Sequence, residues 1–244
     1  MPGKAAYQAC RSLAGASVED ARDAARNLLS IYDAAIIKTL LNGTPNPAEP
    51  ASTEIDRSPL RLSVLLNQNA IDEAQMAFLL ALGGDPNAPD PKSLPLLLVA
   101  ASQGDEGVGL ARQLLEAGAA RDAADEGGHN AIAYATRSPN EAGAMIRELA
   151  RAGVDVDARD HSEEGFTALL AAVFTGREGA VEALIDAGAD LELKTLGPIN
   201  DTAHQVAIFC REDAETDEAR ECCERIEAML ARAAEARAAG SRQG

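Results

Sequence analysis

The sequence predicts an all-α fold in which pairs of antiparallel helices stack as a solenoid. The main observation is a glycine that returns every 35 residues, each time just after a short apolar stretch with helical periodicity. The composition agrees, because 46% of the residues are hydrophobic but only 3% are aromatic. A core built from Ala, Leu, Ile and Val suits closely packed helices better than it suits a sandwich of sheets. The recurring glycines are Gly83, Gly118, Gly153 and Gly188.

Three columns of apolar residues precede these glycines in a constant register. The first column is Met76, Ala111, Ile146 and Val181; the second is Leu79, Leu114, Leu149 and Leu184; the third is Leu80, Leu115, Ala150 and Ile185. Within each unit the columns lie at i, i+3 and i+4, which is one face of an α-helix. The glycine follows the last apolar turn, where a left-handed residue ends a helix without a Cβ penalty. Each phrase therefore marks the end of a helix.

Each unit also contains an earlier helix. These first helices are expected at 58–69 (SPLRLSVLLNQN), 93–104 (SLPLLLVAASQG), 128–139 (GHNAIAYATRSP) and 165–176 (GFTALLAAVFTG). Two of them end at Gly104 and Gly176, whereas Pro139 stops the third, because the residue before a proline avoids the helical conformation. The small residues Ala100, Ala135 and Ala172 recur where two helices must approach closely. One such pair cannot bury both of its faces, so the pairs must stack.

These motifs resemble the ankyrin repeat, whose pattern is roughly G-x-T-P-L-H-x-A-A-x-x-G, then a second helix, then L-L-x-x-G-A-D-x-N. The fourth unit matches at Thr167, Leu169, Ala172, Gly176, Leu184, Gly188, Ala189 and Asp190. The first unit matches in SPLRLSV and LLALGGDPN, and a degenerate fifth unit in DTAHQVAIFC. The resemblance covers roughly residues 55 to 232. It implies an ankyrin-repeat solenoid of stacked helix-turn-helix units with short hairpin loops and helical caps.

The sequence departs from the family pattern in three ways. Its interval of 35 residues exceeds the family period of about 33, which implies longer helices or loops. The usual histidine is replaced by Arg61, Leu98, Ala133 and Leu170. Pro95 and Asn130 stand where the threonine of the second and third units is expected. The turns of these two units are therefore predicted to be less regular than the others.

The domain organisation follows from the repeats. Residues 1–57 are predicted to form an N-terminal helical cap and a Pro-rich loop. In this segment one long helix is expected from its N-cap at Ser17 to Asn42-Gly43. Residues 58–198 are expected to hold four repeats, at about 58–90, 91–125, 126–160 and 161–198. Residues 199–244 are expected to hold the degenerate fifth repeat and an amphipathic capping helix.

Charge and composition exclude several classes of function. The net charge of −17 and the pI of about 4.5 disfavour nucleic acid and favour a protein partner with a basic surface. No signal peptide and no apolar run of about 20 residues is visible, so no membrane span is expected. The four cysteines are too few and too unevenly placed for a disulfide framework, which predicts reduced thiols in the cytoplasm. The preference for Arg over Lys and the many alanines suggest a bacterial source.

The residues that could form catalytic or metal-binding motifs have simpler interpretations. The chain has no nucleophile elbow, HExxH, P-loop or Rossmann fingerprint, so an enzyme is not expected. His204, Cys210, Cys222 and Cys223 lie near one another in sequence, but their spacing is not a zinc pattern, and buried Cys as a small hydrophobe is favoured. DPNAPD and DVDARD lack the Gly and Glu of a calcium loop, which favours hairpin turns. The sequence therefore predicts no metal and no cofactor.

The resemblance implies a binding surface on the concave side, formed by the hairpin tips and the exposed face of the first helices. Mapped onto this sequence, the partner-binding positions are Arg57, Lys92, Leu94, Glu126, His129, Arg137, Glu163, Glu164, Phe166, Phe174 and Thr175. Phe166 and Phe174 stand out because the chain has only four Phe. An exposed aromatic beside carboxylates resembles a binding hot spot with a polar rim. Alternatively, Phe174 packs against the neighbouring unit, and the sequence leaves both interpretations open.

The acidic stretches 160–165 and 211–221 likewise allow two interpretations, a solvated face or a docking patch for a basic partner. The sequence thus predicts a non-enzymatic interaction module. It would be an acidic adaptor that binds a basic protein, or an acidic inhibitor that binds and neutralises one. The alternative is a structural, assembly or chaperone-like scaffold that acts through self-association. A monomer is expected under the first hypothesis, and a concentration-dependent oligomer under the second.

Overall fold

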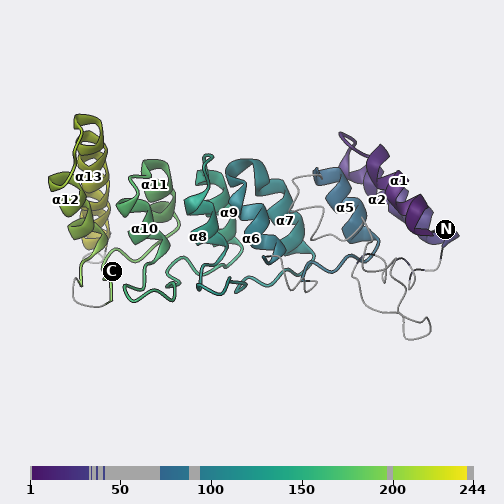
Figure 1. Cartoon of the computed structure of the whole chain (residues 1–244), viewed down its shortest axis with the longest axis horizontal. Helices are drawn as coiled ribbons and strands as arrows, with labels where there is room; N and C mark the ends of the chain where they lie inside the picture. Colours follow the sequence, from purple (N-terminus) through teal and green to yellow (C-terminus); the bar gives the residue numbers. More distant parts are fainter. Residues whose placement is uncertain are drawn as a thin grey trace. The chain divides into compact units, whose positions relative to one another are not determined.

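The computed structural model describes residues 2–32, 34, 37, 41, 72–87, 94–196 and 200–240 (Figure 1). Contacts divide the chain into two compact units, residues 1–100 with 109–120 and residues 101–108 with 121–244. Throughout the described residues the regular elements are helices, and the extended segments form isolated bridges only. The predicted all-α fold is confirmed. The first helix expected for the first repeat, at 58–69, lies outside the described residues.

In the first unit, the described helices comprise an N-terminal pair and parts of the first two repeats. They are α1 (Pro2–Ser12), α2 (Val18–Ile31), α5 (Glu73–Ala81), most of α6 (Leu96–Ser102) and nearly all of α7 (Val108–Glu116). Helix α2 packs against α5, and α1 also contacts α5. The N-cap Ser17 accepts a hydrogen bond from the Asp20 N–H, as expected for a helix that begins with acidic residues.

The prediction of one long helix from Ser17 to residue 43 is wrong. Helix α2 ends at Ile31, and Tyr32 adopts an extended backbone conformation with φ −121° and ψ 151°. Residues 34, 37 and 41 are again helical. Helix α1, which buries Ala6 and Cys10, was not anticipated from the sequence.

The second unit contains three successive helix pairs that stack (Figure 1). They are preceded by the short 3-10 helix η2 (Gly104–Gly107) and consist of α8 (Ala131–Arg137) with α9 (Gly143–Arg151), α10 (Ala168–Phe174) with α11 (Glu178–Asp186), and α12 (Ala203–Glu212) with α13 (Asp217–Gly240). Among the first helices, α10 contacts both α8 and α12. Among the second helices, α11 contacts both α9 and α13. This arrangement is a stack of helix-turn-helix units.

The predicted apolar columns form the core. All members of the first two columns are fully buried, and Leu149 and Leu184, for example, are 0% exposed. The third column, represented by Ile185, is only half-buried and therefore lies at the edge of the buried face. Ala100, Ala135 and Ala172 are also 0% exposed, which agrees with close helix approach at these positions.

The recurring glycines end the second helices as predicted. Their φ angles are 92°, 93°, 88° and 92° in chain order, all in the left-handed region. Gly188 N–H donates to the Ile185 carbonyl (3.1 Å), and Ala189 N–H donates to the Leu184 carbonyl (3.0 Å). The other three glycines repeat this pair of bonds, which is the Schellman motif. Here the sequence rule and the structure coincide.

Antiparallel hairpins connect the successive pairs of the second unit. An isolated bridge closes each hairpin: Ala124 with Asn130, Arg159 with Thr167, and Lys194 with Thr202. Asn130, Thr167 and Thr202 are then the N-caps of α8, α10 and α12. The prediction of a less regular turn at Asn130 is wrong for the helix cap, because the Asn side-chain oxygen accepts from the Ala133 N–H (3.0 Å) just as Thr does.

Candidate protein-binding surface

In the second compact unit, residues 101–108 with 121–244, the first helix of each pair exposes one face. These helices are α8, α10 and α12, and equivalent residues form rows across their exposed faces. The residue just before each N-cap is His129, Phe166 or Asp201, and the residue seven positions after each N-cap is Arg137, Phe174 or Phe209. Phe174 is 59% exposed and Phe209 is 58% exposed. Two large aromatic side chains are thus exposed on the neighbouring helices α10 and α12. The equivalent position on α8, in the third repeat, is Arg137.

The two aromatic residues of the fourth repeat, Phe166 and Phe174, contact each other. The ring centroids of Phe166 and Phe174 lie 6.1 Å apart in an edge-to-face arrangement with an interplanar angle of 62°. Phe166 is half-buried, so its ring fixes one edge of Phe174 while most of Phe174 remains open. Of the two interpretations of Phe174, the exposed ring agrees with the structure, and the ring contacts Phe166 of the same repeat.

The hairpin closed by the Arg159–Thr167 bridge leads into the fourth repeat and is therefore named the fourth hairpin; Asp160 organises it. Its Oδ1 accepts hydrogen bonds from the Ser162 N–H (3.2 Å), the Ser162 hydroxyl (2.5 Å) and the Phe166 N–H (2.9 Å). Burial alone would raise the pKa of Asp160, but these bonds from Ser162 and Phe166 outweigh it and lower the pKa. Glu163 at the tip is exposed, and Glu164 is half-buried. The hairpin therefore presents a carboxylate beside the aromatic pair.

The third hairpin, which is closed by the Ala124–Asn130 bridge and leads into the third repeat, is organised by Asp125, 35 residues before Asp160. The Asp125 carboxylate accepts from the His129 N–H (2.8 Å) and the Tyr134 hydroxyl (2.9 Å), and His129 Nδ1 lies 3.0 Å from its Oδ2. Burial opposes the charge of Asp125, but the hydrogen bonds from His129 and Tyr134 are stronger and lower its pKa to about 2. Asp125 is thus held ionised by the residues around it.

His129 also connects the third and fourth hairpins. Its Nε2 lies 3.6 Å from Asp160 Oδ2, and an Arg137 guanidinium nitrogen lies 3.9 Å from the same oxygen. A backbone bond from the His161 N–H to the Gly127 carbonyl (2.8 Å) reinforces this connection. Two of the predicted binding residues, His129 and Arg137, are therefore also part of the scaffold that holds adjacent hairpins together.

The remaining predicted site residues are scattered. Arg57 and Lys92 lie outside the described residues. Leu94 precedes α6 in the first unit and is 36% exposed. Glu126 is exposed on the third hairpin, and its carbonyl lies 3.1 Å from His161 Nδ1. Thr175 is the exposed C-cap of α10, and its hydroxyl donates to the Ala171 carbonyl (2.7 Å).

Asp125 and Leu196 are not among the predicted site residues, whereas Phe209 falls at a position near the end of a first helix where the repeat pattern predicts an open face. Leu196 is 49% exposed, and its N–H donates to the Glu164 carbonyl (2.6 Å), so it lies beside the fourth hairpin. The sequence signal for Asp125 is that it lies 35 residues before Asp160, which in turn lies 35 residues before Thr195, each near the start of a hairpin.

The cysteines are free thiols. Burial, reinforced by Asp72, raises the pKa of Cys10 to about 11, and burial together with Glu178 raises the pKa of Cys222 to about 11. Both are protonated at neutral pH and therefore weak nucleophiles. In the part of the chain that the structure describes, no three His, Cys, Asp or Glu side chains are grouped so that they could hold a metal ion.

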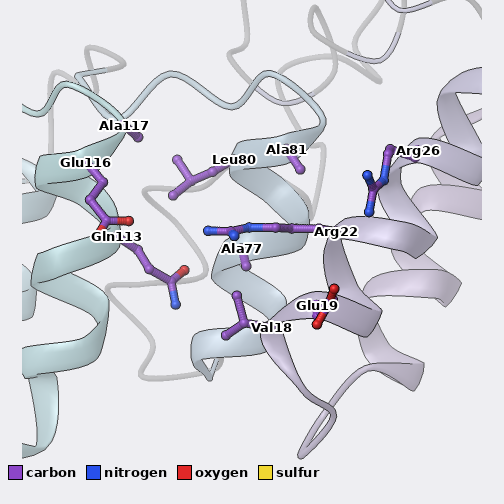
Figure 2. Close-up of a pocket in the computed structure, with 10 residues that line it drawn as sticks. All are labelled: Val18, Glu19, Arg22, Arg26, Ala77, Leu80, Ala81, Gln113, Glu116 and Ala117. Atoms are coloured by element: carbon purple, nitrogen blue, oxygen red, sulfur yellow. The ribbon is translucent and has the colours of Figure 1, made fainter.

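A groove in the first unit is a separate feature (Figure 2). It has a volume of about 890 Å³ and is lined by Val18, Glu19, Arg22, Arg26, Ala77, Leu80, Ala81, Gln113, Glu116 and Ala117. Figure 2 shows Arg22 pointing from α2 across the groove. Gln113 Nε2 donates to the Glu73 carbonyl (3.0 Å), while its buried Oε1 has no hydrogen-bond partner. The groove has charges of both signs and contains none of the predicted site residues.

Stacked helix pairs with glycine-terminated second helices and capped first helices define a helical-repeat protein. Residues 97–195 match the family model described as ankyrin repeats (3 copies), and no curated protein matches the chain. Residues 97–195 of the chain therefore form ankyrin repeats. Ankyrin repeats generally mediate protein–protein interaction, and the family is typically non-enzymatic. None of the described helices is long and apolar enough to cross a membrane.

Proposed function

We propose that this protein is a non-enzymatic adaptor or inhibitor that captures, and as an inhibitor neutralises, a partner protein with a basic surface in the cytoplasm. The partner would contact the hairpin tips and the exposed faces of the first helices in the second unit. The observation that carries the proposal is the open ring of Phe174, 59% exposed and supported by Phe166. An exposed aromatic with a fixed orientation loses little conformational freedom when a partner covers it.

The charge distribution supports a basic partner. Residues 121–244 contain 13 basic and 25 acidic side chains, which gives a net charge of −12 out of −17 for the whole chain. The same part of the chain carries Phe174 and Phe209. Such a field attracts a basic protein over distance and accelerates association most strongly at low salt.

The individual residues would have different roles. Phe166 and Phe174 would form the apolar centre of the interface, and Glu163 and Glu164 the adjacent acidic rim. Glu126, His129, Arg137 and Thr175 would form the polar periphery. The carboxylates of Asp125 and Asp160 already engage His129 and Arg137, so these two would contribute less than the aromatic pair.

The test begins with a partner isolated on the immobilised protein and then purified. Calorimetric titration should give an affinity that falls as salt rises from about 0.01 M to about 0.1 M, because the Debye length shortens from about 30 Å to about 10 Å. Phe174→Ala should weaken binding about 30-fold or more, as expected for a hot-spot residue. Glu163→Gln should weaken it at low salt, whereas Glu182→Gln is the matched control, since Glu182 is an exposed carboxylate on the second helix α11.

Two results would contradict the proposal. Unchanged affinity of the folded Phe166→Ala and Phe174→Ala variants would remove the aromatic centre. Salt-independent binding would remove the basic partner. The alternative, a scaffold that self-associates, predicts a sedimentation coefficient that rises with protein concentration when no partner is added.

A further inference from the structure

The exposed aromatics of the second unit are spaced regularly. Phe174 on α10 and Phe209 on α12 occupy equivalent positions, seven residues after the N-caps Thr167 and Thr202. Helices α10 and α12 pack against each other. Packed helices have axes about 8–10 Å apart. The two rings therefore form a pair of apolar contact points separated by roughly one helix diameter.

This spacing matches the periodicity of a helix. Residues i and i+7 of an α-helix lie on the same face and about 10.5 Å apart along its axis. A partner helix that crosses α10 and α12 would place two such side chains on the two rings. The apolar pair ends at α8, because the equivalent residue there is Arg137.

A helix fits this face better than an extended segment. The exposed backbone of α10 and α12 is already hydrogen-bonded within each helix, so no free edge remains for strand addition. An extended segment would leave its own N–H and C=O groups without partners on this surface. A helix satisfies its backbone internally and needs only side-chain contacts.

The carboxylates around the row determine the charge of the partner. Glu212 lies on the exposed face of α12, three residues after Phe209, and is exposed. The segment that follows is strongly acidic, because residues 212–224 contain seven carboxylates and one arginine. Glu163 is exposed at the tip of the fourth hairpin. Lysines and arginines flanking the apolar stripe would therefore be favoured, and acidic residues would be repelled.

We propose that the partner is recognised through a basic amphipathic helix that lies across α10 and α12 and places apolar side chains at i and i+7 on Phe174 and Phe209. This inference rests on the proposed function and names the chemistry of the segment that is bound. It places Phe209, rather than the third hairpin, at the second contact point of the interface.

Two synthetic Lys/Ala peptides, each about five helical turns long and of identical composition, test this proposal. One carries leucines at i and i+7, and the other at i and i+9, which puts them on opposite faces. The full-length protein should bind the first peptide about tenfold more tightly than the second in fluorescence anisotropy at low salt, the gain expected from one additional buried side chain. Phe174→Ala and Phe209→Ala should each abolish this preference, and Glu212→Gln should weaken both peptides equally.

Several outcomes would overturn the inference. These are equal affinity for the two peptides, no binding of either, or an unchanged preference in a Phe209→Ala variant whose circular dichroism is that of the parent protein. The native partner separates this failure from failure of the proposed function. If its binding is lost in Phe166→Ala and Phe174→Ala but kept in Phe209→Ala, the proposed function stands and the inference fails. If all three variants keep full affinity, both fail.

Discussion

The third and fourth hairpins start from equivalent aspartates and present different surfaces. Asp125 is surrounded by the His129 ring and the Tyr134 hydroxyl, so the third hairpin is closed by polar contacts. Asp160 bonds Ser162 and the backbone of Phe166, which leaves the aromatic side chain free to reach Phe174. Asp125 and Asp160 thus each accept the hydrogen bonds that hold their own hairpin together. What is presented beside each aspartate differs, and this difference is what a binding partner can distinguish.

The third and fourth repeats also differ in the length of the hairpin and in the length of the connection between their two helices. Only four residues separate Asp125 from the N-cap Asn130, but six separate Asp160 from the N-cap Thr167. The connection between the two helices compensates, with five residues in the third unit (138–142) and three in the fourth (175–177). The interval of 35 residues is therefore kept by two opposite changes. Hairpin length and the connection between the two helices therefore both vary while the interval between the second helices stays the same.

The largest expected effect tests whether the second helices of the third and fourth repeats, α9 and α11, are buried equivalently. Leu149→Ala and Leu184→Ala each remove a side chain that is 0% exposed at equivalent positions. Each should lower the free energy of unfolding by about 2–5 kcal/mol, measured by urea titration with circular dichroism. Ile185→Ala, at the half-buried edge, is the control and should lose clearly less. A loss for Leu184→Ala no larger than that for Ile185→Ala would refute this equivalent burial.

The next effect compares the two aspartates directly. The Asp160 side chain is 9% exposed and serves three donors at Oδ1, and its loss leaves the part-buried Phe166 N–H without this acceptor. Asp160→Ala should therefore lower the free energy of unfolding by about 1–3 kcal/mol. Asp125→Ala should lose less, because its side chain is 18% exposed. Glu163→Ala, an exposed control, should stay within about 0.5 kcal/mol of the parent protein. A larger loss for Asp125→Ala would reverse the comparison.

The comparison also explains what could be predicted from the sequence. Gly188 ends its helix and Leu184 is buried because local backbone geometry and helical periodicity determine both. Thr167 caps its helix for the same local reason. Such features repeat in every unit and are therefore visible as columns in a single sequence.

Features that depend on contacts between units could not be predicted in this way. The sequence places Asp160 in a hairpin turn and an acidic stretch, yet its position beside His129 and Arg137 requires the third and fourth hairpins to be adjacent. His129 was assigned to partner binding, although two carboxylates of the scaffold lie beside it. The break of the N-terminal helix at Tyr32 was missed because the apolar periodicity continues through it.

A smaller effect concerns pH. Because the folded protein lowers the pKa of Asp125 to about 2 from an ordinary value of 3.8, its carboxylate stabilises the fold above about pH 4. This contribution should be lost as the pH falls from about 4 to about 2. The free energy of unfolding of Asp125→Asn should therefore decline less steeply over this range than that of the parent protein. Glu163→Gln, which removes an exposed carboxylate of the next hairpin, is the charge-matched control, and equal slopes for Asp125→Asn and the parent would contradict the assignment.

The smallest expected effect isolates one group that the third hairpin has and the fourth lacks. Tyr134 donates its hydroxyl to Asp125 Oδ2 (2.9 Å), and the equivalent position in the fourth unit is Ala171. Tyr134→Phe should lower the free energy of unfolding by about 0.5–1.5 kcal/mol, because one hydrogen bond is lost and the ring remains. In the Asp125→Ala background the same substitution should have almost no effect, since the acceptor is already gone. If Tyr134→Phe destabilises both backgrounds equally, the hydroxyl acts through another group, and the polar closure of the third hairpin depends on His129 alone.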